Sequence, residues 1–268
     1  MSRRVKGMFK INFRLKAPEE ICPWGSGMHW FGLTDSLLWI NVGDKVIYEY
    51  SEDALKLYGC QRYNDYQLSR FLEDFSELFS STAVSVPHEL YEAAECFFEM
   101  SEEWRRSYID EPDEIFDEFY YNEYAGLTEW YGARTMNSGH LVGGPNISFV
   151  RCGDMLKIIW DSIDMLENGG NMWTSPKGIY EMDYGEFAYE TKRFFGEFFT
   201  AMDGQVRKSC EMDWGDINLD KARLCEENVQ RREMFEQRLR TLDDTASEGN
   251  YRQILGLFEK MKTEINYN

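Results

Sequence analysis

The apolar residues of this chain change their spacing along the sequence, and that change limits the folds available to it. Between Phe9 and Lys16, apolar and polar residues alternate, which is the pattern of a β-strand with one solvent-facing side. From Asn64 onward, the apolar residues between Leu68 and Phe79 recur every three or four positions, which predicts an amphipathic helix with Asn64 as its N-cap. Helix follows sheet, so the sequence predicts an α+β fold.

Two later stretches each predict a β-hairpin. Residues 37–50 are typical of two strands around residues 41–44, an Asn-Val-Gly-Asp sequence that favours a turn. Residues 147–150 and 156–160 are apolar runs joined by residues 151–154, which also contain a glycine. Strands joined by short turns pair in antiparallel fashion, so we expect a mostly antiparallel sheet.

Helical spacing predicts that helices pack against this sheet and form the C-terminal part. We expect helices at 87–108, 113–125 and 185–208, one from a cap at Asn218 to about residue 242, and one at 251–265. A strand is also expected within 172–182. A chain of 268 residues is near the upper limit for one hydrophobic core. We therefore expect a single α+β domain over 1–268, divisible into a mixed part at 1–183 and a helical part at 184–268.

The negative charge of the chain is concentrated in one segment. Between Glu89 and Glu129 there are fourteen Asp or Glu residues and two Arg, so this segment carries −12 of the net charge of −19. By contrast, the stretch from Leu219 to Lys262 has nine acidic and nine basic residues. This asymmetry predicts one strongly acidic face.

Aromatic residues lie among these carboxylates, a mixture that suits a surface that attracts a basic partner and then holds it. The predicted partner-binding residues are Asp110, Glu111, Asp113, Glu114, Asp117, Glu118, Trp104, Tyr120, Tyr121 and Tyr124. Carboxylate pairs such as Asp110 with Asp113 could also bind a divalent cation, but such pairs arise by chance in so acidic a segment. We expect no metal site there.

The charge balance argues against several classes of protein. A net charge of −19 repels phosphate backbones, so direct binding of DNA or RNA is disfavoured. The basic run from Met1 to Lys16 is expected to pair with the protein's own acidic surface or to form the solvent face of a strand. No stretch has the roughly 18 apolar residues of a membrane span, and no signal peptide is recognisable, so we expect a cytoplasmic protein without a membrane partner.

Few residues point to catalysis or to a cofactor. The six cysteines include no Cys-x-x-Cys pair, which argues against a zinc knuckle or a redox dithiol and favours reduced thiols. The three histidines have no metal-ligand spacing, and the glycine motifs of hydrolases, NTPases and dehydrogenases are missing from the sequence. We therefore expect no cofactor, and binding is favoured over enzyme activity.

One set of residues supports an alternative, an enzyme or small-ligand site. A histidine and an aspartate that converge on one cleft could serve as a base and its orienting partner, and Arg70 could pair with Asp74 on one face of a helix. The predicted cleft residues are His29, Trp30, Asp35, Tyr66, Arg70 and Asp74. The simpler interpretations are a partly buried His29 between aromatics and a structural salt bridge between Arg70 and Asp74.

A motif near the N-terminus resembles a known family. Pro23-Trp24-Gly25 is followed by His29-Trp30-Phe31-Gly32-Leu33-Thr34-Asp35 and by Trp39-Ile40. This order, continued by Tyr66, Arg70, Glu73, Asp74, Gly144-Pro145, Trp160-Asp161 and residues 194–202, is similar to an uncharacterised bacterial family defined only as a domain of unknown function. The likeness spans roughly residues 9–206, with Ser36 where glycine is expected and no counterpart for the acidic segment at 100–131.

The resemblance implies a bacterial, intracellular α+β domain and no established activity. Small acidic bacterial proteins are often immunity proteins that neutralise a toxin, although this step is an analogy. The leading hypothesis is therefore an immunity or inhibitor type of protein that docks on the basic surface of a toxin or nuclease. The rivals are the enzyme or small-ligand cleft described above and a structural, oligomeric subunit whose aromatics form the interface and whose acids keep it soluble.

Overall fold

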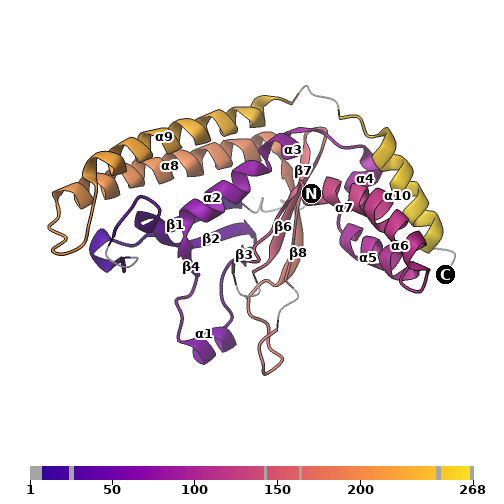
Figure 1. The fold of residues 1–268 in the computed structure, drawn as a ribbon, viewed down its shortest axis with the longest axis horizontal. Coiled ribbons are helices and arrows are strands. Elements are labelled where there is room, and N and C mark those ends of the chain that lie inside the picture. The colour runs from indigo at the N-terminus through magenta and orange to yellow at the C-terminus, as the bar shows by residue number, and fades with distance from the viewer. Residues whose placement is uncertain (1–7, 24–26, 142–143, 163–164, 246–248, 266–268) are drawn as a thin grey trace, which may run out of the picture.

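The computed structural model describes residues 8–23, 27–141, 144–162, 165–245 and 249–265, and within them the chain has the predicted α+β fold, with two antiparallel sheets and surrounding helices (Figure 1). Two sets of residues from the sequence analysis lie outside this part. They are residues 1–7 of the basic run, and Trp24 and Gly25 of the motif.

The first sheet is built around β2 (Asp35–Gly43). β1 (Met8–Leu15) pairs with β2 along its whole length, and β3 (Lys45–Ile47) and β4 (Asn64–Gln67) share the other side of β2. The predicted hairpin is confirmed, with Gly43 in the left-handed conformation at its turn. Asn64 is not a helix cap, because its backbone pairs with Leu38 in this sheet; the helix begins at Leu68 with Gln67 as its N-cap.

The second sheet separates two hydrophobic clusters. Its strands are β5 (Thr135–Met136), β6 (Asn146–Cys152), β7 (Met155–Asp161) and β8 (Lys177–Asp183), paired in this order. Side chains alternate across a strand, so Phe149 and Ile158 face the first cluster while Val150 and Ile159 face the second. Burial on both faces explains why the strands of the predicted second hairpin are apolar runs.

The first cluster fills the space between the sheets and a pair of long helices, α8 (Tyr184–Glu211) and α9 (Lys221–Arg240), which lie side by side (Figure 1). α8 buries a phenylalanine stripe that includes Phe194, Phe195 and Phe198, as its spacing predicts. Asp220, not Asn218, caps α9, because its side chain accepts a hydrogen bond from the Arg223 N–H. The shorter elements of this half are η1 (Pro18–Glu20), η2 (Gly32–Thr34), α1 (Glu52–Tyr58), α2 (Leu68–Glu77), α3 (Phe79–Ala83) and η4 (Thr241–Asp243).

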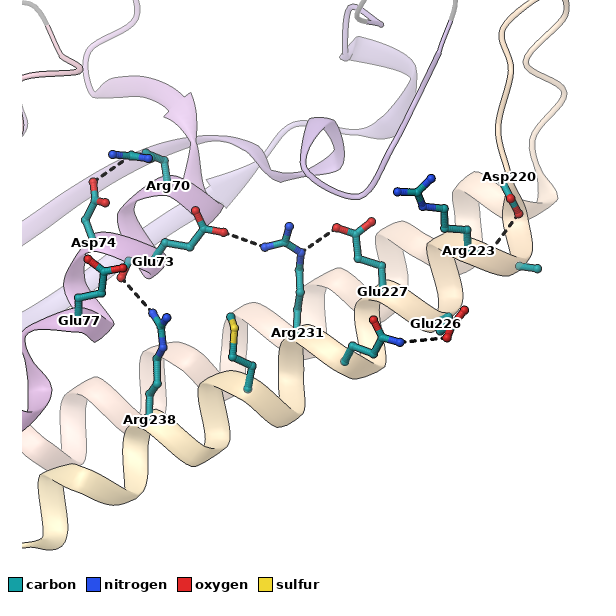
Figure 2. A pocket seen from close by; sticks show the side chains of 13 residues that line it. Arg70, Glu73, Asp74, Glu77, Asp220, Arg223, Glu226, Glu227, Arg231 and Arg238 are labelled. Carbon is teal, nitrogen blue, oxygen red and sulfur yellow. Dashed lines mark hydrogen bonds and ion pairs between the residues drawn. The ribbon is translucent and has the colours of Figure 1, made fainter.

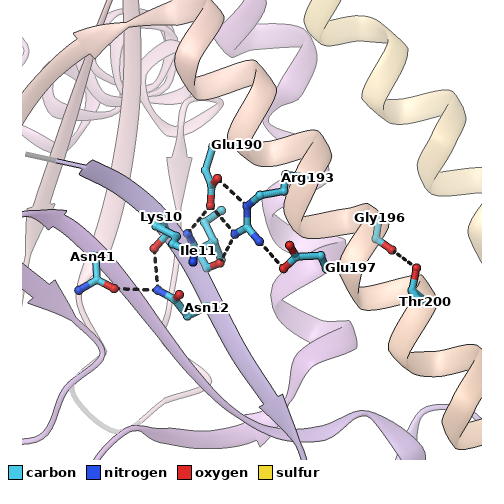
Figure 3. A network of polar contacts seen from close by, with 9 residues as sticks. All are labelled: Lys10, Ile11, Asn12, Asn41, Glu190, Arg193, Gly196, Glu197 and Thr200. Atoms are coloured by element: carbon cyan, nitrogen blue, oxygen red, sulfur yellow. Dashed lines mark hydrogen bonds and ion pairs between the residues drawn. The ribbon is translucent and has the colours of Figure 1, made fainter.

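α8 also covers the open edge of β1. The Glu190 carboxylate accepts a hydrogen bond from the Ile11 N–H at 2.9 Å, and Arg193 donates to the Ile11 carbonyl at 2.7 Å (Figure 3). Arg193 also pairs with Glu190 and Glu197, and these carboxylates raise its pKa. An edge strand exposes unpaired backbone groups that can pair with a strand of another molecule. Glu190 and Arg193 occupy the backbone groups of Ile11 and so hinder such pairing.

The second cluster lies on the other face of the second sheet and contains the acidic segment. Its helices are α4 (His88–Ala93), α5 (Phe97–Ser107), α6 (Asp113–Phe119), the π-helical turn η3 (Tyr120–Tyr124), α7 (Ala125–Gly132) and α10 (Arg252–Ile265). The helix predicted at 87–108 is interrupted at Ala94–Cys96, and the one predicted at 113–125 continues through η3 to Gly132. α10 packs on α5, so the C-terminal helices divide between the two clusters.

Candidate functional site

Six of the predicted partner-binding carboxylates form one exposed surface where α5 turns into α6. We call Asp110, Glu111, Asp113, Glu114, Asp117 and Glu118 the acidic corner. All six side chains are exposed, and they make no ion pair or hydrogen bond with any residue that the structure describes. No ion pair with a described residue therefore offsets their mutual repulsion, which water and dissolved ions screen.

Exposed apolar side chains lie beside the acidic corner in the sequence. Ile109 is 59% exposed, Ile115 is 48% exposed and Tyr121 is 69% exposed. Ile115 belongs to α6, and Tyr121 belongs to η3, which follows α6 directly. Unpaired carboxylates and exposed apolar side chains therefore occur in the same stretch of the chain.

The base beneath the acidic corner is rigid because it is packed with aromatic rings. Tyr108 stacks on Phe119 with 3.8 Å between ring centroids, and Trp104 contacts the same ring edge-on at 4.9 Å. Trp104 and Tyr108 both donate hydrogen bonds to the Glu264 carboxylate of α10, at 2.6 and 2.9 Å. Burial, together with the nearby Glu264 carboxylate, raises the pKa of Tyr108 to about 12.

This packing corrects part of the predicted binding surface. Trp104 is fully buried and Tyr124 is buried, with its hydroxyl donating to Glu102, while Tyr120 is half-buried against Tyr124. Of the four predicted aromatic anchors, Tyr121 alone is exposed. The sequence pattern missed this because burial of Trp104 depends on α10, which is more than 140 residues away in the chain.

Other acids of the segment are used internally. Glu102 accepts hydrogen bonds from Arg105 and Tyr124, and these bonds lower its pKa. Glu123 forms an ion pair with Lys260 of α10 at 2.5 Å. Some carboxylates of this region therefore support the packing. The six of the acidic corner do not, and neither do exposed Glu95, Glu99 and Glu103 of α5 and its approach.

A second candidate site is a groove of about 930 Å³ between α2 and α9 (Figure 2). An ion pair crosses this groove, because the Arg231 guanidinium of α9 lies 2.8 Å from Glu73 of α2. Arg231 also pairs with Glu227, four residues earlier on its own helix, at 2.8 Å. Arg238 donates to the Ser76 hydroxyl at 2.7 Å. The arginines of α9 thus tie the helix to α2, and much of the groove's charge is neutralised by pairing.

The residues of the predicted cleft do not form one site. Trp30 is a fully buried core residue whose Nε1 donates to Asn228 at 2.9 Å, and Arg231 covers its ring. Asp35 accepts a hydrogen bond from Gln67 at 2.8 Å. His29 is exposed, and its Nδ1 accepts a hydrogen bond from the Gly32 N–H. These three residues are not part of the groove lining.

Tyr66, Arg70 and Asp74 do come together, but with His140 in place of His29. Arg70 pairs with Asp74 at 3.1 Å, and the His140 Nδ1 lies 3.8 Å from the same carboxylate. The Tyr66 and His140 rings are 5.1 Å apart. A second cavity of about 620 Å³, which His140 lines, shares Arg70, Asp74 and Glu77 with the groove.

Burial favours the neutral form of His140. It lowers the pKa of the imidazole, and this effect outweighs the opposing attraction of Asp74. A neutral imidazole beside a carboxylate can accept or donate a hydrogen bond to a polar ligand. Sequence reasoning missed His140 because it lies in a loop without a motif and reaches Asp74 only through the fold.

Two other hallmarks of function are absent from the residues that the structure describes. No three side chains of His, Cys, Asp or Glu lie close enough to hold a metal ion in the described ranges. None of the helices within those ranges has the length and apolar character needed to cross a membrane.

Comparison with known proteins places the chain in a family without assigning an activity. No curated protein and no solved structure matches it. One family profile does match, over residues 10–254, and this range extends beyond the likeness seen in the sequence and includes the acidic segment. The chain belongs to that family, which is described as a family of unknown function (DUF5984).

Proposed function

We propose that this protein binds another protein, and that the acidic corner docks on a basic surface of that partner. One observation carries the proposal: the six carboxylates of the acidic corner are exposed and have no partner among the described residues, beside exposed Ile109, Ile115 and Tyr121. Carboxylates that stabilise the fold are paired with basic side chains, as Glu73 and Glu227 are paired with Arg231 in the groove. Unpaired ones on a rigid base remain available for a partner.

Two kinds of side chain have different roles on such a surface. Unpaired carboxylates attract a basic partner and raise the association rate, while desolvated aromatic and aliphatic groups supply most of the affinity. Tyr121 is the aromatic group that is exposed for this role, with Ile109 and Ile115 beside it in the sequence. Truncation of such an anchor costs roughly 2 kcal/mol of binding free energy or more.

Within this class, we favour an immunity or inhibitor role against a toxin or nuclease. A nuclease must bind phosphates, so its functional surface is rich in Lys and Arg. An acidic corner that covers this surface would compete with the nucleic acid directly. The support is charge complementarity together with the analogy to small acidic immunity proteins.

A capture experiment with charge-reversed variants tests the proposal. The test variant carries Asp113→Lys, Glu114→Lys, Asp117→Lys and Glu118→Lys. The matched control carries Asp44→Lys, Glu52→Lys, Asp216→Lys and Glu233→Lys, four exposed carboxylates from other parts of the fold with the same total change in charge.

The wild-type protein and the control are expected to capture the same basic protein from the native host, identified by mass spectrometry. The test variant is expected to lose that protein and to lose any rescue of cells from a co-expressed toxin partner. Equal capture by both variants would overturn the proposal and leave solubility as the reason for the acidic composition.

A small polar ligand in the groove is a second candidate function. It is favoured by the two adjoining cavities, which share Arg70 and Asp74. His140 lines the second of these cavities. Arg70→Ala and His140→Ala variants test it by thermal-shift screening against polar metabolites. A ligand that stabilises wild type but neither variant supports this function. A lower Tm for Arg70→Ala with no ligand effect would leave Arg70 a structural role only.

A further inference from the structure

Two cysteines that are distant in the sequence lie together where α8 ends and α9 begins. The sulfur atoms of Cys210, in the last turn of α8, and Cys225, in the second turn of α9, are 3.9 Å apart. Cys225 is exposed and Cys210 is half-buried. The sequence argued against a redox dithiol because it has no Cys-x-x-Cys pair, but here the fold supplies the proximity.

The connection between the two helices is held by several hydrogen bonds. The Lys221 ammonium donates to the Cys210 carbonyl at 2.6 Å, and the Trp214 indole donates to the Ser209 carbonyl at 2.8 Å. The Asn218 carbonyl accepts from the Met28 N–H at 3.0 Å. The two thiols are therefore presented by a fixed scaffold.

We propose that Cys210 and Cys225 are an oxidative modification site that forms a disulfide with an oxidant of the glutathione disulfide class. A disulfide has an S–S length of about 2.05 Å, so the sulfurs must approach by about 1.9 Å more. Cys225 faces solvent, so its side chain is free to rotate. Rotation of the two cysteine side chains supplies a movement of this size. The site is independent of the acidic corner and of the proposed partner.

The reaction proceeds by two thiol–disulfide exchanges. The exposed Cys225, as thiolate, attacks one sulfur of oxidised glutathione, and the first glutathione leaves as a thiolate that takes up a proton. Cys210 then loses its proton and attacks the Cys225 sulfur, and the second glutathione leaves in the same way. Two protein thiols are oxidised to one disulfide, and one oxidised glutathione is reduced to two glutathione molecules.

The two thiols differ in a way that sets this order. Burial and the adjacent Cys225 raise the pKa of the Cys210 thiol, so Cys210 is a poor first nucleophile. Once Cys225 carries glutathione, its sulfur is within reach of Cys210, and attack becomes intramolecular. The cross-link fixes the first turns of α9, which supply Asp220 and Arg223 to the groove.

The wild-type protein provides the direct test. The folded protein is incubated with oxidised glutathione, its remaining thiols are alkylated, and its peptides are mapped by mass spectrometry without reduction. The expected result is a cross-linked pair of peptides containing Cys210 and Cys225, which dithiothreitol separates, and a Tm raised by about 5 °C or more. Absence of this peptide pair when glutathione reacts elsewhere would overturn the proposal.

Serine variants test the order of attack. Cys210→Ser is expected to retain one glutathione on Cys225, and Cys225→Ser is expected to keep Cys210 reduced for at least ten times longer than in the wild type. Cys60→Ser removes another exposed thiol and is expected to leave the cross-link unchanged. Loss of the Cys210 thiol in Cys225→Ser at the wild-type rate would contradict the mechanism. Circular dichroism checks that each variant is folded.

Discussion

The groove between α2 and α9 and the acidic corner use charge in opposite ways. In the groove, Arg231 pairs with Glu73 and Glu227, and the charges hold two helices together. In the acidic corner, the carboxylates have no partner among the described residues, and the helices beneath them are held by aromatic rings and α10. Removing charge should therefore destabilise the first region and leave the stability of the second unchanged.

The largest expected effect tests whether aromatic packing supports the acidic corner. Trp104→Ala removes a fully buried ring and should lower the free energy of unfolding by about 3–5 kcal/mol. Trp104→Phe keeps most of the apolar contact but loses the hydrogen bond to Glu264, so its loss should be smaller. Urea denaturation measures both values. If Trp104→Ala unfolds at the wild-type urea concentration, aromatic packing does not support the acidic corner.

The next effect tests the structural role of charge in the groove. Arg231→Ala breaks two ion pairs and the contact with the Trp30 ring, and should lower the free energy of unfolding by about 1–2 kcal/mol. Arg223→Ala, on the same helix and exposed, should change stability by less than about 0.5 kcal/mol. Equal losses in the two variants would mean that pairing in the groove contributes nothing specific.

A smaller effect depends on pH and on His140. Because burial holds the pKa of His140 below that of a free imidazole, the unfolded chain binds a proton more readily than the folded one. Stability from this residue is therefore full above pH 6.5 and decreases as the pH falls through the pKa of the unfolded state toward that of the folded one. His140→Gln should reduce this acid sensitivity in thermal unfolding scans.

His88→Gln is the control for this prediction. His88 is exposed on α4 and lies 3.5 Å from Glu92. Its removal should leave the acid sensitivity of the wild type in place. If His88→Gln reduced the acid sensitivity and His140→Gln did not, His140 would not be its source.

The smallest change in stability is expected at the acidic corner itself. The fourfold charge reversal at residues 113, 114, 117 and 118 should change the free energy of unfolding by less than about 1 kcal/mol. No described ion pair is lost, and relief of repulsion with the neighbouring acids offsets the loss of Asp113 and Glu114 from the first turn of α6. Its binding phenotype should be large by comparison. For the wild type, stopped-flow association with the captured partner should slow as salt is raised. A rate unaffected by salt would indicate an apolar interface, as the oligomeric rival predicts.

The parts of the fold that local sequence determines could be predicted. The alternation in β1, the two hairpins and the phenylalanine stripe of α8 reflect periodicities within a few residues of each other, and the structure contains all of them. The helix break at Ala94–Cys96 was missed because neither proline nor glycine marks it.

The candidate site residues depend more on long-range contacts than the strands and helices do, so their burial and their neighbours are harder to predict from the sequence. The six carboxylates are exposed as expected, because charge alone keeps them in water. The sequence pattern places Trp104 and Tyr124 at the surface, because it does not contain the partners from other helices that bury them. It also favours His29 over His140 for the cleft, because the proximity of His29 to Trp30 and Asp35 in the sequence does not show which loop meets Asp74.

The packing of α10 on α5 also has a consequence for synthesis of the chain on the ribosome. The residues that enclose the first cluster are all synthesised once the chain reaches Leu242, before α10 is made. The second cluster needs Phe258, Met261 and Glu264 before Trp104 is enclosed. The base of the acidic corner is therefore completed last, and a chain that is cut before α10 would lack the support of the proposed docking surface.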